Sequence, residues 1–132
     1  MSIVVGYLSA ERGRAALELA INEAKLRSTD VVVVHSIHGG VRSDDEDIIS
    51  SDQELEDLDA ELEMAGVEHS IHNYVRGNDP AKDIILAAKE FDAELIVIGL
   101  RKRTAAGKFL LGSNAHDILM DAPCPVLTVR AG

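Results

Sequence analysis

The chain has 132 residues, of which 46% are hydrophobic and 27% charged, and its formal net charge is −10. This length suits one domain, residues 1–132, and the core must be aliphatic because the chain has no Trp, two Tyr and two Phe. The negative charge argues against a nucleic-acid partner, whose phosphates would be repelled. The longest apolar stretch, residues 95–100, is far shorter than the ~20 residues of a membrane helix, so we expect no membrane partner.

The compartment can be inferred from two features. The N-terminus has no basic flank and no long apolar region, so we expect no signal peptide. The single cysteine, Cys124, cannot form an internal disulfide, which suits a reducing environment. The sequence therefore predicts a cytoplasmic protein.

The first half of the chain alternates apolar runs with helical periodicity. Residues 3–6 and 31–34 are nearly continuous in apolar residues, which is typical of strands buried on both faces. Each of these runs is followed by a segment whose apolar residues recur with helical spacing. The apolar residues are Ala16, Leu17, Ala20, Ile21 and Ala24 in the first segment, and Leu55, Leu58 and Leu62 in the second. Residues 51–54, Ser-Asp-Gln-Glu, have capping-box spacing and predict the start of the second helix.

The second half continues the alternation. Residues 69–75 are mixed in polarity and predict an edge strand, and Asp79-Pro80 predicts an N-cap followed by proline at the first helical position. A buried strand is expected at 95–98, and Ser113 can cap a last helix that runs to about Asp121. Pro123-Cys124-Pro125 then leads to a final apolar strand at 126–129. Strands alternating with helices predict right-handed crossovers and a parallel sheet.

Two groups of polar residues raise the question of a metal. Residues 44–63 carry 11 acidic residues and no basic one, and the leucine stripe within them favours a solvated acidic helix face over a metal site or a binding tail. His69 and His72 are three apart on a strand, so they should point to opposite faces and cannot share an ion. His116 should be exposed in the last helix. No sequence feature requires a metal.

The richest candidate site follows the strand at 95–98. Ligands of an open parallel sheet bind beyond the carboxyl ends of its strands, near the point where strand order reverses. The segment after Gly99 carries four cations, namely Arg101, Lys102, Arg103 and Lys108. Gly112, Ser113 and Asn114 then open a helix whose N–H groups can bind a phosphate. An exposed basic loop followed by an ordinary N-cap explains the same residues, and spacing alone does not separate the two.

A family resemblance bears on this choice. Gly99, Gly112-Ser113 and the stretch from Asp121 to Leu127 (Asp-Ala-Pro-Cys-Pro-Val-Leu) resemble the Gly-x2-Gly-x9-Gly-Ser/Thr pattern and final strand of the universal stress protein family. The resemblance implies a doubly wound five-stranded parallel sheet of order 3-2-1-4-5, an adenine-nucleotide alpha-hydrolase-like (Rossmann-like) three-layer sandwich. It also implies a homodimer through the last strand, Val126 to Val129. Many members bind ATP or AMP, and some bind no nucleotide.

The chain departs from that pattern at two positions. Leu8 occupies the place where nucleotide-binding members carry an aspartate that holds the ribose or the base edge, and leucine cannot accept a hydrogen bond. Lys102 replaces the second glycine, which removes close backbone approach but adds a cation for a β- or γ-phosphate. Ribose recognition is therefore weakened while phosphate attraction is kept. Ser36 falls near the place where the family closes over the adenine.

Three functions follow from these residues. The first is a stress-response module that binds or senses ATP or AMP in a cleft built by Tyr7, Leu8, Ser36, Gly99, Lys102, Gly112, Ser113 and Asn114. The second is a nucleotide-free interaction protein in which Leu8 fills the adenosine cleft. The third is an enzyme, which lacks support because no general base stands beside a nucleophile, so at most slow ATP hydrolysis is expected. The phosphate loops of common NTPases and the dinucleotide fingerprint are absent from the sequence.

Overall fold

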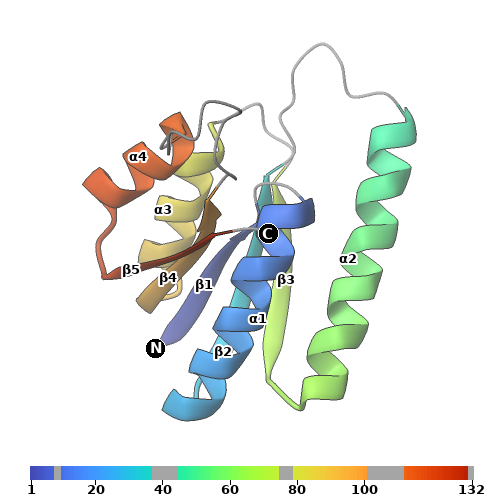
Figure 1. Cartoon of the computed structure of the whole chain (residues 1–132), viewed down its shortest axis with the longest axis horizontal. Coiled ribbons are helices and arrows are strands. Elements are labelled where there is room, and N and C mark those ends of the chain that lie inside the picture. Colours follow the sequence, from blue (N-terminus) through green and yellow to red (C-terminus); the bar gives the residue numbers. More distant parts are fainter. Residues whose placement is uncertain (8–9, 37–44, 75–78, 101–111, 131–132) are drawn as a thin grey trace.

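The computed structural model describes residues 1–7, 10–36, 45–74, 79–100 and 112–130. Strands and helices alternate along these residues, as the sequence predicts (Figure 1). The elements are β1 (Ser2–Tyr7), α1 (Ala10–Arg27), β2 (Asp30–Ser36), α2 (Asp45–Ala65), β3 (His69–Tyr74), α3 (Pro80–Glu90), β4 (Ala93–Leu100), α4 (Ser113–Asp121) and β5 (Val126–Arg130).

The five strands form one parallel sheet in the order β3-β2-β1-β4-β5. This confirms the predicted doubly wound topology, and β3 lies at an edge as its mixed polarity indicated. The order reverses between β1 and β4, because the chain leaves β1 towards β2 on one side and returns to β4 on the other. That reversal is the place where such sheets open a cleft.

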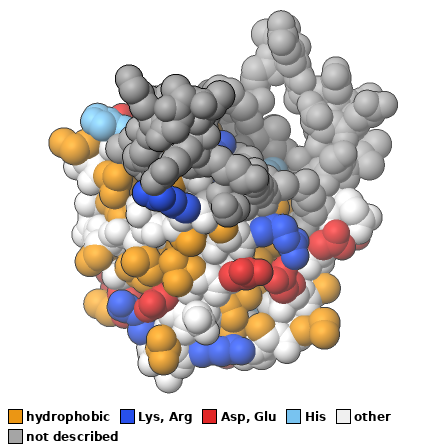
Figure 2. All heavy atoms as spheres, viewed as in Figure 1, with side chains coloured by type: hydrophobic (Ala, Val, Ile, Leu, Met, Phe, Trp, Pro, Cys, Tyr) orange, Lys and Arg blue, Asp and Glu red, His pale blue; other side chains and the backbone are white. Residues whose placement is uncertain are grey.

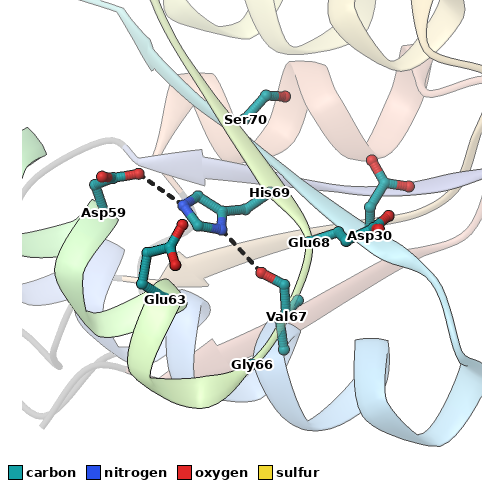
Figure 3. A pocket seen from close by; sticks show the side chains of 8 residues that line it. All are labelled: Asp30, Asp59, Glu63, Gly66, Val67, Glu68, His69 and Ser70. Atoms are coloured by element: carbon teal, nitrogen blue, oxygen red, sulfur yellow. Dashed lines mark hydrogen bonds and ion pairs between the residues drawn. The ribbon is translucent and has the colours of Figure 1, made fainter.

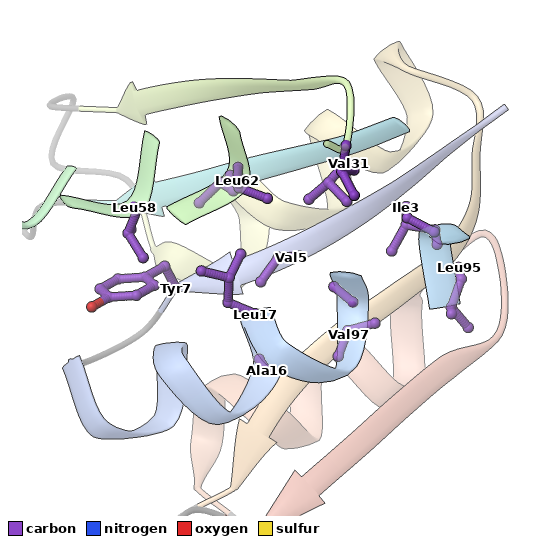
Figure 4. Close-up of a cluster of buried hydrophobic side chains, with 14 residues drawn as sticks. Ile3, Val5, Tyr7, Ala16, Leu17, Val31, Leu58, Leu62, Leu95 and Val97 are labelled. Atoms are coloured by element: carbon purple, nitrogen blue, oxygen red, sulfur yellow. The ribbon is translucent and has the colours of Figure 1, made fainter. Parts of the chain in front are cut away.

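Two hydrophobic cores lie on the two faces of the sheet, which makes the fold a three-layer sandwich. Ile3 and Val5 point into the core under α1 and α2, together with Leu17 and Leu62 (Figure 4). Val4 lies between its register partners Val32 and Ile96 and points into the core under α3 and α4. Successive strand residues are buried on opposite faces, which is why the central strands read as continuous apolar runs.

Two predicted helix starts differ from the structure. Helix α2 begins at Asp45, so the Ser-Asp-Gln-Glu motif at 51–54 lies inside the helix and is not its capping box. Acidic residues at positions 45–47 suit the positive end of a helix and allow the earlier start. The N-cap of α4 is Gly112 in an extended conformation (φ −65°, ψ 160°), and Ser113 is the first helical residue instead of the cap. The prediction for α3 is confirmed, because Asp79 is its N-cap and Pro80 its first residue.

The surface is of mixed character on the face seen in Figure 2, where acidic and basic side chains are interspersed with apolar ones. The net negative charge of the chain therefore does not make this face uniformly acidic. Among the described residues, no helix is both long and apolar enough to cross a membrane.

Candidate functional site

The carboxyl edge of the sheet brings the ends of β1, β2 and β4 together. Tyr7 ends β1 and pairs with His35 of β2, while Gly6 pairs with Ile98 of β4, one residue before Gly99. Because the strands are parallel, each helix starts at this same edge, and the first turns of α1, α3 and α4 follow the strand ends. The structure thus gathers residues that are far apart in the sequence around the switch point between β1 and β4.

Tyr7 supports this edge from inside. Its side chain is only 3% exposed and belongs to the core under α1 (Figure 4). Its ring is in edge contact with the imidazole of His35 at a centroid distance of 5.6 Å. The ring also lies against Gly13 of α1, where an added Cβ would come within 2.1 Å of it. The described contacts give this predicted site residue a packing role at the junction of β1 and α1.

Gly99 lets α1 approach β4. A Cβ at this position would lie 2.2 Å from the backbone carbonyl oxygen of Arg12 in the first turns of α1. Any side chain would therefore push the helix away from the strand. The sequence interpretation assigned this glycine to ligand approach; the structure shows a helix backbone against it.

The start of α4 is held firmly at the same edge. Ala115 and Ile118 are buried in the core under α3 and α4, which anchors the helix, and the Gly112 carbonyl accepts a hydrogen bond from the His116 N–H at 2.9 Å. Ser113 is exposed and Asn114 half-buried. The first N–H groups of any α-helix lack acceptors within the helix, so they can donate to an anion.

The other predicted site residues are only partly placed. Ser36 is the last residue of β2 and pairs with Tyr74, but its side chain lies outside the described part of the chain, as do Leu8 and Lys102. The remaining cations of the basic segment, Arg101, Arg103 and Lys108, also fall outside it.

One residue at this edge escaped the sequence interpretation. Asp83 is 2% exposed although it is acidic, and it lies in the first turn of α3, where its N–H donates to the Asp79 carbonyl at 3.2 Å. The signal for Asp83 was present, since a carboxylate one turn after an Asp-Pro start is typical of a helix N-terminus. Its burial depends on packing that periodicity does not reveal.

His69, His72 and His116 lie as expected. His69 and His72 point to opposite faces of β3, His69 towards Asp59 of α2 and His72 against the ring of Phe91 at a centroid distance of 4.9 Å. The side chain of His116 is 63% exposed. Among the described residues, no group of three or more His, Cys, Asp or Glu side chains is arranged to hold a metal ion.

A hollow of about 640 Å³ lies at the opposite, amino edge of the sheet (Figure 3). Four carboxylates line it, and these are Asp30, Asp59, Glu63 and Glu68. A nucleotide phosphate would be repelled there. The carboxyl edge is therefore the better candidate for an anionic ligand.

Comparisons with known proteins agree with this architecture. Residues 1–130 match the Universal stress protein family. A universal stress protein of Mycolicibacterium smegmatis is 41% identical over 128 residues, which cover 97% of this chain and 96% of that protein. The solved structure of a universal stress protein from Archaeoglobus fulgidus superposes with a TM-score of 0.83 at 40% identity, covering 97% of this chain and 96% of that one.

A second structure carries a ligand. It is a universal stress protein from Archaeoglobus fulgidus in complex with dAMP, with a TM-score of 0.74, 36% identity, and coverage of 97% of this chain and 95% of that one. The sheet order and the switch point define a doubly wound α/β protein of the adenine-nucleotide alpha-hydrolase-like fold. The chain belongs to the universal stress protein family.

Proposed function

We propose that the protein is a cytoplasmic adenine-nucleotide binding or sensing module of the stress response, with its site at the carboxyl edge between β1 and β4. The observation that supports the proposal is the start of α4, which is anchored by the buried Ala115 and Ile118 and faces the carboxyl edge of the sheet. The first N–H groups of a helix suit a phosphate, and the basic segment that precedes α4 supplies cations. The relative 36% identical to this chain is in complex with dAMP, which supports a nucleoside monophosphate or a longer adenine nucleotide as ligand.

The proposal predicts how affinity depends on phosphates. If Lys102 attracts a phosphate as a point charge, affinity should rise from adenosine through AMP to ATP and should fall with added salt. Titration calorimetry with these ligands and with dAMP measures the series. Lys102→Ala should weaken the binding of ATP more than the binding of adenosine. Lys89→Ala removes an exposed lysine from the last turn of α3. It should change the affinity for neither ATP nor adenosine, and it serves as the matched control.

Leu8 tests the ribose side of the same site. A missing hydrogen bond of roughly 1–3 kcal/mol corresponds to about a five- to 150-fold weaker complex, so we expect micromolar or weaker binding of ATP. The substitution Leu8→Asp should increase the affinity for ATP. Nanomolar binding by the unmodified protein would contradict the assignment of Leu8 to the ribose position.

A null result has a definite meaning as well. If neither dAMP, AMP nor ATP binds at millimolar concentration, the nucleotide proposal is wrong. The nucleotide-free interaction protein, with Leu8 in the adenosine cleft, then becomes the better interpretation. Mass spectrometry of gently purified protein is an independent check, because it detects a nucleotide that is retained from the cell.

We also propose a homodimer through β5. This strand pairs with β4 on one side and lies at the edge of the sheet, with Leu127 and Val129 half-buried against the core under α1. An apolar edge strand invites pairing, and a two-fold copy would close the edge. Analytical ultracentrifugation should give the mass of two chains, and charged residues at positions 127 and 129 should give monomer or insoluble protein. A mass of one chain for the unmodified protein would overturn this proposal.

A further inference from the structure

His69 is the first residue of the edge strand β3, and its imidazole contacts both α2 and the turn that follows α2. Its side chain is 7% exposed, and both ring nitrogens have partners (Figure 3). The Nδ1 atom lies 2.8 Å from the carbonyl oxygen of Val67, and the Nε2 atom lies 2.6 Å from the Oδ1 atom of Asp59 on α2. The contact therefore joins the helix, the turn after it and the strand.

Both partners of the ring accept hydrogen bonds, and this favours its doubly protonated form. A carbonyl oxygen and an ionised carboxylate cannot donate, while a neutral imidazole carries one N–H only. Both contacts are hydrogen bonds only when the ring is doubly protonated. A carboxyl group loses its proton far more readily than an imidazolium does, so the shared proton belongs to His69 and the pair is imidazolium and carboxylate.

The surroundings of the ring are acidic. Glu63 of α2 acts on the ring through its charge, and Glu68 immediately precedes the histidine. Both line the hollow with Asp59 and Asp30, and no Lys or Arg among the described residues lines it. Burial by itself lowers the pKa of His69, but the hydrogen bonds to Val67 and Asp59 and the charges of Asp59 and Glu63 outweigh it. The net pKa is raised above the ordinary value of 6.5.

Helix α2 is attached to the rest of the fold through its apolar stripe, which places Leu58 and Leu62 in the core. Two of its described side chains, Asp59 and Glu61, also form ion pairs with other elements. Arg14 of α1 reaches Glu61 at 3.3 Å, in an exposed contact, while the His69–Asp59 pair fastens the helix to β3. Of these two ion pairs, only His69–Asp59 contains a side chain of a type that titrates near neutral pH.

We propose that His69 and Asp59 form a pH-sensitive clamp that holds the C-terminal half of α2 on β3 while His69 is charged. Deprotonation leaves one ring nitrogen with a lone pair facing an acceptor, so one of the two contacts is lost. Because the folded pKa is raised, the clamp is complete below pH 6.5 and loosens as the pH rises through the folded pKa. The clamp lies at the amino edge of the sheet, and the proposal does not depend on nucleotide binding.

Nuclear magnetic resonance tests the clamp at the imidazole itself. In a pH titration, the ring signals of His69 should change with a midpoint above 6.5, and those of the exposed His116 provide an internal comparison. Asp59→Asn removes the carboxylate and should lower the midpoint of His69. Glu63→Gln removes a neighbouring charge but keeps the hydrogen bond, so it is the matched control and should shift the midpoint less.

Amide hydrogen exchange tests the consequence for the helix. After correction for the intrinsic pH dependence, protection of the amides at 58–65 should fall roughly two- to fivefold as His69 loses its proton, which is the range expected for a partly exposed ion pair. The protection of the amides in α1 should not fall as His69 loses its proton. The effect should vanish in Asp59→Asn and in His69→Gln.

Two results would overturn the clamp. One is a His69 midpoint at or below 6.5 in the unmodified protein. The other is a pH-dependent loss of protection in α2 that persists in both variants. Asp59→Asn removes the carboxylate and His69→Gln removes the imidazole. If one of these variants does not fold, the other still tests the clamp.

Discussion

Tyr7 and Gly13 are in direct contact where β1 passes into α1, and a Cβ at Gly13 would lie 2.1 Å from the Cδ2 atom of the Tyr7 ring. The ring is one of the few aromatic side chains of the chain, and it is almost fully buried. The glycine within α1 therefore makes room for a ring at the end of β1. This contact sets how closely the first helix approaches the edge that holds the proposed nucleotide site.

Gly13→Ala should destabilise the protein despite the better helix propensity of alanine. Alanine gains ~1 kcal/mol in a helix, whereas overpacking costs typically ~1–3 kcal/mol, so we expect a net loss of up to about 2 kcal/mol in the free energy of unfolding. Urea denaturation measures it. In a Tyr7→Leu background the clash is removed, and the same substitution should be neutral or stabilising. An equal cost in both backgrounds would contradict the contact.

Gly99→Ala should cost more stability than Gly6→Ala when no nucleotide is present. At Gly99 the new methyl group meets the backbone of Arg12, which cannot move without α1, and we expect a loss of about 3 kcal/mol or more. At Gly6 the nearest atom is the Cδ1 atom of Ile84 at 2.6 Å, the end of a flexible side chain, and a loss of about 1 kcal/mol is expected. Thermal and urea unfolding compare the two. A stable Gly99→Ala protein that had lost only nucleotide binding would instead support a pure ligand role.

Leu62→Ala should show how strongly α2 depends on its apolar stripe. Leu62 is fully buried, and truncating such a side chain costs ~2–5 kcal/mol. Met64→Ala is the control on the same helix, because Met64 is 90% exposed and its loss should change stability by less than ~0.5 kcal/mol. Urea unfolding that gave similar values for both variants would contradict the docking of α2 through Leu62.

Cys124 should react slowly with disulfide reagents at neutral pH. Burial raises the pKa of the Cys124 thiol above its ordinary value, and only the thiolate is nucleophilic. The reaction rate with an aromatic disulfide should therefore be lower in the folded chain than in urea, and it should rise steeply only at alkaline pH. The chain has a single cysteine, so the measurement needs no further variant. A rate plateau reached below pH 8 would indicate an activated thiol instead.

Local patterns predicted the alternation of strands and helices and the parallel sheet, whereas the strand order came from the family resemblance. Val31 to Val34 form an unbroken apolar run, which is typical of a strand covered on both faces, as β2 is. The mixed run that became β3 indicated an edge for the same reason. Family-like spacing around Gly99 and Gly112 then predicted a site at the switch point, and in the structure Gly99 directly follows the residue of β4 that pairs with Gly6 of β1.

Only the tertiary structure decided what the individual side chains touch. Gly99 meets the backbone of Arg12, which lies far from it in the sequence, and Tyr7 turns into the core although the sequence analysis assigned it to the nucleotide cleft. His69 finds Asp59 because α2 docks its leucine stripe beside β3. Periodicity records which face of a segment is buried, but not the neighbour that covers it. That neighbour depends on strand register and helix docking, which are set by the packing of the whole chain.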